Sequence, residues 1–235
     1  MAIEREDIVI GESLPYLRPF ICKGNWKRAK VMLTGINPAT PISSVEISYE
    51  DYRKLLEDYD SFLVFYQKKR KQAGKTALSR TRQGIGALVE FIWKETGSSV
   101  IETDVCTYPT ASVKELERVD GKLKQKGREL FWKVLEESGV EMVICYGKQA
   151  FEDFFLLLEE QRVSGCWKSG EPSAELLKRD CAALEKMSPV GHLEWKGRRI
   201  VFFVVRHLMY YGKSGASYEE VKQKIAEWGK KECLY

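Results

Sequence analysis

Four short runs of apolar residues stand out along the chain, and each predicts a buried β-strand. The runs are rich in valine or isoleucine, which is typical of strands covered on both faces in a parallel sheet. The four expected strands are residues 30–34, 99–105, 140–145 and 199–206.

Between these runs, apolar side chains recur at steps of three and four residues, the spacing of one helix face. The expected helices are residues 49–72, 85–93, 127–137, 148–160, 173–186 and 218–228. Ala73-Gly74 and Gly139 stand where the first and third of these helices should end. Strands alternating with helices predict an α/β fold, a three-layer α/β/α sandwich with a central, mainly parallel four-stranded sheet.

A β-hairpin is expected to lead into the last strand. Residues 192–195 would pair with the strand at 199–206, and Lys196-Gly197 would form the turn between them.

The composition predicts that the chain belongs to the class of soluble globular proteins. It has 235 residues, of which 44% are hydrophobic, and this fits a single domain over residues 1–235. No window approaches ~18 consecutive apolar residues, and the N-terminal residues lack the order of a signal peptide. We therefore expect a cytoplasmic protein with no membrane partner.

Charge and cysteine content add two further expectations. Lys and Arg total 38 against 34 for Asp and Glu, a net charge of +4 that permits DNA as a partner without requiring it. The basic clusters at 68–71, 122–128 and 196–199 are typical of solvated faces. The six cysteines show no Cys-x-x-Cys spacing and the chain has two histidines, so we expect free thiols and no metal site. The oligomeric state stays open.

The ends of the four strands are the places to look for chemistry, because ligands of open α/β sheets bind outside the carboxyl ends of the strands. Two of these ends resemble the close of a phosphate-binding loop, at Gly147-Lys148 and at Gly212-Lys213-Ser214. Neither has the opening glycine, since Met142 and His207 occupy that position. Nucleoside triphosphate hydrolysis is therefore not expected.

The first strand end, Gly35-Ile36-Asn37-Pro38, has two interpretations. It is a tight turn in which Gly35 permits a close approach and Pro38 fixes the direction of the chain. It is also a place where an amide side chain, held by the following proline, can position a water over a ligand.

The last strand end places His207 at the mouth of the sheet. A lone histidine is more often structural than catalytic. Here it is followed by bulky side chains, Leu208 to Tyr211, and then by glycines and small residues. Exposed bulky side chains on a glycine-rich loop are what an element that wedges a DNA duplex requires.

The order of these strand ends resembles the uracil-DNA glycosylase superfamily of DNA repair hydrolases. The similarity runs from about residue 30 to 217 and consists of Gly35-Ile36-Asn37-Pro38, Thr103 to Thr110, Tyr146 to Ala150, and His207. The first of these elements looks most like the mismatch-specific and single-strand-selective branches.

The resemblance implies a role for each matching residue. Asn37 would position the hydrolytic water, and His207 would stabilise negative charge on the departing base. Gly35, Ile36, Asp104 and Tyr108 would contact the base, with Tyr49 and Tyr52 as further stacking candidates that helix packing also explains. No cofactor is implied. The expected wedge and DNA-binding residues are Leu208, Met209, Tyr210, Tyr211, Lys213 and Ser214. Ser217 is a further candidate for phosphate contact, although its position before Tyr218 favours capping a helix.

Two departures from the family pattern affect the expected substrate. Leu208-Met209 replace the Pro-Ser that follows the family histidine, which changes the shape of the loop. Asp104 replaces an asparagine that reads uracil, and an ionised carboxylate has acceptors only. Facing O4 of uracil, it would cost roughly 1–3 kcal/mol. A base with an amino group, such as adenine, cytosine or guanine, suits Asp104 better, unless the carboxyl group is protonated or itself activates water.

The sequence leaves three candidate functions open. The first is excision of a modified or mismatched base from DNA. The second is a module of the same fold that binds a base or nucleic acid without catalysis, and the third is hydrolysis of a free nucleoside or nucleotide.

Overall fold

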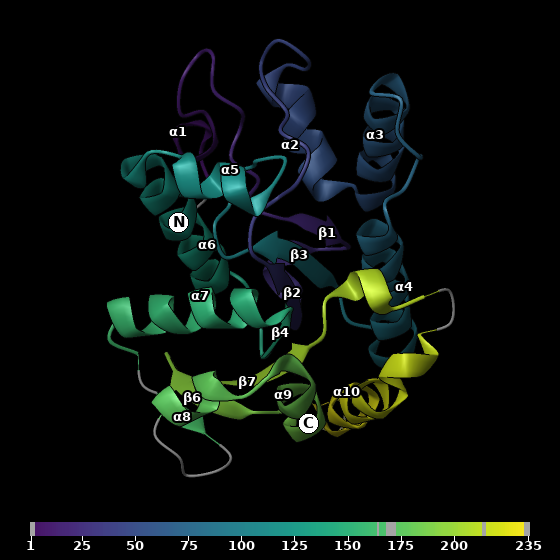
Figure 1. Ribbon diagram of the computed structural model, residues 1–235, viewed down its shortest axis with the longest axis vertical. Helices are drawn as coiled ribbons and strands as arrows, with labels where there is room; N and C mark the ends of the chain where they lie inside the picture. Colours follow the sequence, from purple (N-terminus) through teal and green to yellow (C-terminus); the bar gives the residue numbers. More distant parts are fainter. Residues whose placement is uncertain (1–2, 164, 168–172, 213–214, 233–235) are drawn as a thin grey trace.

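The protein is an α/β protein built on a mixed sheet of seven strands, as its computed structural model shows (Figure 1). The structure describes residues 3–163, 165–167, 173–212 and 215–232. Within them the strand order is β1-β3-β2-β4-β7-β6-β5. The strands are β1 (Ile21–Lys23), β2 (Val31–Gly35), β3 (Val100–Asp104), β4 (Met142–Tyr146), β5 (Cys166–Trp167), β6 (Gly191–Trp195) and β7 (Arg198–Val205).

The centre of the sheet consists of β3, β2, β4 and β7, which run parallel to one another. These are the four strands that the apolar runs predict, and nearly all of their residues are buried. The observed sheet is larger than the four-stranded sheet that was expected. Three further strands, β1, β6 and β5, extend the parallel centre and pair in the antiparallel sense. With three and two residues, β1 and β5 are too short to leave a pattern in the sequence.

The hairpin before the last strand is confirmed. β6 pairs antiparallel with β7, and Trp195 stands opposite Arg198. The two residues between them, Lys196 and Gly197, both have positive φ angles, of 49° and 75°. This is the conformation of a two-residue turn whose twist matches that of the strands.

Helices fill the connections between the strands (Figure 1). They are α1 (Arg5–Ile8), α2 (Tyr49–Glu57), α3 (Tyr59–Gln72), α4 (Arg80–Thr96), α5 (Val113–Arg118), α6 (Gly121–Glu137), α7 (Lys148–Glu160), α8 (Ser173–Lys178), α9 (Cys181–Met187) and α10 (Glu219–Glu232). In the part of the chain that the structure describes, none of them is long and apolar enough to cross a membrane.

Several helix boundaries differ from the prediction for local reasons. The expected helix over 49–72 breaks at Asp58, whose carboxylate accepts hydrogen bonds from the first backbone N–H groups of α3. Asp180 likewise caps α9 and divides the segment expected at 173–186. Gly139 does not terminate α6, because the last turn closes on Ser138 in an extended conformation. The prediction for α7 is confirmed at both ends.

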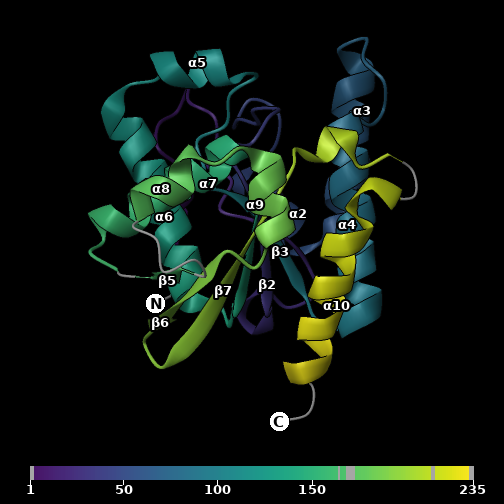
Figure 2. The ribbon, with the colours of Figure 1, turned by 60° about the horizontal axis from the view of Figure 1, so that its bottom comes forward.

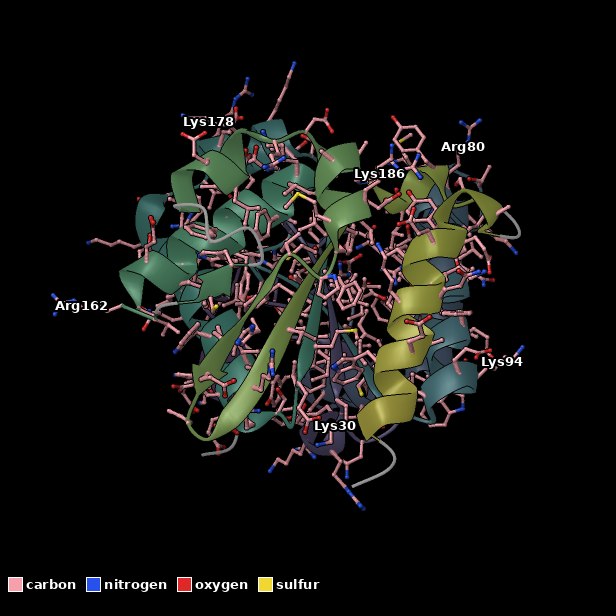
Figure 3. All side chains as sticks on the ribbon, turned by 90° about the horizontal axis from the view of Figure 1, so that it is seen from below. Lys30, Arg80, Lys94, Arg162, Lys178 and Lys186 are labelled. Carbon is pink, nitrogen blue, oxygen red and sulfur yellow. The ribbon has the colours of Figure 1, made fainter. Side chains whose placement is uncertain are left out.

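Helices cover both faces of the sheet, with α6 and α7 on one face and α4 and α10 on the other (Figure 2). On the first face, the Phe154 ring packs against Phe131 at 5.7 Å and against Phe202 of β7 at 5.4 Å. Burial of each such side chain stabilises the fold by ~1.5–3 kcal/mol. Basic side chains such as Arg80, Lys94 and Arg162 extend outward at the periphery (Figure 3).

Candidate functional site

A cavity of about 460 Å³ opens at the carboxyl ends of the parallel strands. Its volume falls within the ~300–1,000 Å³ typical of sites that enclose a small ligand. Residues at or just after the ends of all four parallel strands line it, including Ile36 and Asn37 after β2, Asp104 at the end of β3, Tyr146 at the end of β4 and His207 after β7. The structure thus brings the three principal candidates from the sequence, Asn37, Asp104 and His207, to one cavity.

The side chain of Asn37 is held from one side only. Its Nδ2 group donates to Thr110 Oγ1 at 2.8 Å, and Thr110 N–H donates to the Pro38 carbonyl at 3.1 Å. Among the hydrogen bonds of the described residues, none uses the Asn37 side-chain carbonyl. Asn37 therefore presents a fixed acceptor beside the cavity, which is the group needed to orient a water.

Gly35 serves the close packing of two other site residues. A Cβ atom at this position would lie 2.3 Å from the Tyr146 hydroxyl and 2.5 Å from Asp104 Oδ1. Gly35 does not line the cavity. The space that it leaves is occupied by Tyr146 and Asp104, which corrects the expectation that it admits a base.

Asp104 is a buried carboxyl group with an unusual affinity for its proton. It is 4% exposed, and the Tyr146 hydroxyl donates to its Oδ1 at 3.3 Å. Burial, opposed by Arg18 and assisted by the negative charge of Glu102, raises the pKa of Asp104 to about 7. Near neutral pH the group is therefore present both as an acid, which can donate, and as a carboxylate, which only accepts.

Replacement of Asp104 with asparagine is expected to remove a pH dependence from the stability of the protein. The folded-state pKa of about 7 lies above the value of about 4 in an unfolded chain, so the folded protein holds an extra proton between these pH values. Its free energy of unfolding therefore falls as pH rises from about 4 to about 7, by as much as ~4 kcal/mol, and then levels off.

Urea denaturation of both proteins at about pH 5 and about pH 8 measures this effect. The wild type should lose more stability than Asp104→Asn across the interval, since asparagine does not titrate. His207 is present in both proteins, so its titration cancels in the comparison. Equal losses would contradict the raised pKa of Asp104.

His207 is oriented by its own loop. Its Nδ1 accepts from the backbone N–H of Met209 at 3.3 Å, and the Tyr218 hydroxyl donates to its carbonyl at 3.1 Å. Burial lowers the pKa of His207 below its ordinary value, so the neutral ring predominates at pH 7. Because Nδ1 acts as the acceptor, the single ring proton lies on Nε2, and a neutral donor results at the edge of the cavity.

Three buried charged residues of the cavity were not predicted from the sequence. Arg82 of α4 forms a buried ion pair with Glu102 of β3, and Arg18 lines the same cavity. Burial alone would lower the pKa of Arg82, but Glu102 and nearby tyrosine hydroxyls outweigh it and raise the pKa, so the charge is kept. Glu102 carries a signal that the sequence offered, namely a charged residue two positions before Asp104 in a buried strand.

The loop after His207 is packed inward more than expected. Leu208 is fully buried and packs against α4. The carbonyl oxygen of Leu208 comes so close to Gly84 of this helix that a Cβ atom on Gly84 would lie only 2.0 Å from it. Tyr211 is 3% exposed and packs on Tyr218 with the ring centres 5.1 Å apart. Neither side chain is available as a wedge, which corrects that expectation.

Met209 and Tyr210 of the same loop remain exposed, by 39% and 64%. Lys213 and Ser214 lie outside the described residues.

The expected stacking residues lie elsewhere in the fold. Tyr108 is 7% exposed, and neither it nor Tyr49 or Tyr52 lines the cavity. The Tyr52 hydroxyl donates to the Leu17 carbonyl within the core, which confirms the packing role that its helix spacing allows. Ser217 Oγ donates to the Tyr210 carbonyl at 3.4 Å. None of these side chains is placed to stack on a base inside the cavity.

No protein-family model and no curated protein matches the chain. In the described ranges, no cluster of three or more His, Cys, Asp or Glu side chains is arranged to hold a metal ion. The chemistry open to the site is therefore inferred from the side chains that line it.

Proposed function

We propose that this protein is an N-glycoside hydrolase of the DNA-glycosylase type, which releases a base from a nucleotide by water attack at the glycosidic bond. One observation carries the proposal. Asn37, Asp104 and His207 come at or just after the ends of three different strands, and all three line one cavity. A water-orienting amide, a group that reads a base edge and a neutral donor are the functions that this reaction needs.

Asn37 positions the attacking water. Its Nδ2 group is engaged by Thr110, so its carbonyl accepts a hydrogen bond from water and fixes the direction of attack. Holding a reactant in the right geometry contributes a large part of the rate enhancement in such reactions. Within DNA the glycosidic bond lies inside the stack, so the nucleotide must first be flipped into the cavity.

His207 stabilises the leaving base. Bond breaking leaves an oxocarbenium-like sugar and an anionic base, and a fixed donor aimed at the developing charge lowers the barrier. The Nε2–H of a neutral His207 is such a donor. Its orientation depends on the bond from Met209 N–H to Nδ1, which ties the ring to the loop that follows β7.

Asp104 selects the base. As a carboxylate it accepts from an exocyclic amino group, and as an acid it donates to a base carbonyl. The pKa of about 7 makes both pairings accessible around neutral pH. Bases with an amino group are favoured above this pH, and bases with a carbonyl group below it.

We further propose that the chain is a divergent member of the uracil-DNA glycosylase superfamily, a proposal with which the observed arrangement of strands and helices is compatible. Four parallel strands carry the site at their carboxyl ends, and helices lie on both faces of the sheet (Figure 2). We infer a three-layer sandwich of that superfamily, in a divergent member whose wedge is reduced to Met209 and Tyr210.

A second candidate function is hydrolysis of a free nucleoside or nucleotide. It is favoured by the burial of Leu208 and Tyr211, which leaves only two exposed bulky side chains in the described part of the loop to displace a base from a duplex.

A panel of oligonucleotides containing uracil, hypoxanthine, xanthine or alkylated bases tests the proposal. Strand breaks after alkali treatment would show base release. Release from monomers but not from oligonucleotides would select the second candidate. DNA binding that weakens steeply with salt and yields no abasic product would indicate a binding module instead.

Replacement of Tyr210 with alanine is expected to lower activity on duplex DNA about tenfold while sparing single-stranded DNA. The reason is that stacking of an exposed ring on a base is worth ~1–3 kcal/mol, and only a duplex has to be opened. Leu156→Ala, which removes an exposed side chain from α7, is the control. Equal losses on both substrates would argue against a wedge at Tyr210.

A further inference from the structure

Two buried arginines, Arg18 and Arg82, belong to the cavity but have no part in the hydrolysis proposed above. They are 5% and 6% exposed, and both line the cavity. Their guanidinium carbons lie 5.5 Å and 5.6 Å from the centre of the Phe62 ring, so one aromatic side chain of α3 supports both groups. A buried cation is costly unless an acceptor or an anion meets it.

The protein satisfies only part of the hydrogen-bonding capacity of these two side chains. Arg18 donates to the Ala39 carbonyl at 3.3 Å, and Arg82 donates to Glu102. Each guanidinium group has five N–H donors. Some side-chain nitrogen and oxygen atoms of the described residues are fully buried and have no hydrogen-bond partner. No nitrogen of Arg18 or Arg82 is among them. The nitrogens without a partner therefore keep some contact with solvent, and both side chains line the cavity.

Charge also remains uncompensated. Glu102 neutralises Arg82, whereas no described carboxylate lies within ion-pair distance of Arg18. Asp104, which interacts with Arg18 electrostatically, is partly protonated near neutral pH because burial raises its pKa to about 7. The end of α3 and the residues after it add Lys69, Arg70 and Lys75 to the cavity lining, in which Glu102 and Asp104 are the only acidic residues among those described. Lys69 is paired with Glu46, whereas Arg70 and Lys75 have no ion pair among the described residues.

We propose that Arg18 and Arg82 form a subsite for a phosphate group of the nucleotide whose base occupies the same cavity. The planar fork of a guanidinium group matches phosphate oxygens, and low-dielectric walls strengthen the attraction. This subsite rests on the proposed function for the identity of the base, and its phosphate comes either from a free nucleotide or from a DNA strand. The cavity is large enough to hold more than a base.

Titration calorimetry with matched pairs of ligands tests the subsite. The probes are inorganic phosphate, the common deoxynucleosides with deoxyuridine and deoxyinosine, their 5′-monophosphates, and short single-stranded oligonucleotides. For at least one base, the monophosphate should bind about tenfold tighter than the nucleoside, the effect of one charge-assisted contact. A free-nucleotide source predicts that the monophosphate outcompetes the oligonucleotide, and a strand source predicts the reverse.

Arg18→Met should reduce this preference to about twofold. The ratio of monophosphate to nucleoside affinity is the readout, because loss of Arg18 also raises the pKa of Asp104 and thereby changes the affinity for the base in both ligands. Arg162→Met, at an exposed position that does not line the cavity, should keep the full preference. Arg18→Lys keeps the charge without the fork, so an intermediate preference is expected. If Arg18→Met does not fold, Arg18→Lys decides the matter.

Two results would overturn the subsite: equal affinity of the wild type for nucleosides and monophosphates, or an undiminished preference in both Arg18 variants. These results are independent of catalysis, because binding is measured without bond cleavage. Base release without a phosphate preference would support the hydrolase and rule out the subsite. A phosphate preference without base release would support the subsite and rule out the hydrolase.

Discussion

Replacement of Asn37 with alanine is expected to lower the rate of base release at least about 100-fold, because the attacking water loses the group that orients it. The loss should fall on the chemical step, so single-turnover rates with saturating enzyme should show it in full. Binding of the substrate, measured by anisotropy of a labelled oligonucleotide, should change little, since Asn37 contacts the water and not the strand.

The fold should survive this change. Asn37 is half-buried, and its loss removes hydrogen bonds to Thr110 that are worth ~1 kcal/mol in net stability. The chain contains one other asparagine, Asn25, which caps a short turn at the surface, so Asn25→Ala is a matched control. If Asn37→Ala releases base as fast as Asn25→Ala does, Asn37 has no catalytic role.

Replacement of Arg82 with methionine is expected to destabilise the protein by roughly 3–5 kcal/mol. The change leaves the Glu102 carboxylate buried without its partner, and the cost of an uncompensated buried charge exceeds the net value of the pair. Urea denaturation at neutral pH measures the loss directly. The stability effect is separate from the ligand-binding role of Arg82, which is read from the affinities of the folded protein.

Two further variants show whether the buried charge is the cause. The double variant Arg82→Met with Glu102→Leu removes both charges, and it should recover much of the lost stability. Arg80→Met removes an arginine from the same helix turn at an exposed position and should cost no more than ~0.5 kcal/mol. If Arg82→Met loses no more stability than Arg80→Met does, the Glu102 carboxylate is not left as an unpaired buried charge.

The centre of the fold was predictable from the sequence because its strands are buried on both faces. Such strands appear as apolar runs, and β2, β3, β4 and β7 were all recognised. The edges of the sheet were not recognised, since β1 and β5 are held by pairing with a neighbour and not by their own composition. The break at Asp58 had a local signal, a capping aspartate, but the apolar spacing continues across it and hid the boundary.

The site was predictable to the extent that it follows strand ends. Asn37, Asp104 and His207 each come at or just after a buried strand, and parallel strands bring such positions together. Arg18 and Arg82 were not predictable in this way, because one lies in an irregular segment and the other in a helix, and only tertiary packing directs them inward. The burial of Leu208 was hidden for the same reason, as it depends on the space above Gly84.

A structure of the Asn37→Ala variant bound to the nucleotide or oligonucleotide that it binds most tightly tests the central claim most directly. The base should lie in the cavity, with one edge within roughly 3 Å of an Asp104 oxygen and a leaving-group atom at a similar distance from His207 Nε2. The glycosidic carbon should face the position vacated by the Asn37 amide. A ligand whose base lies outside the cavity, or inside it without contact to Asp104 and His207, would contradict the account.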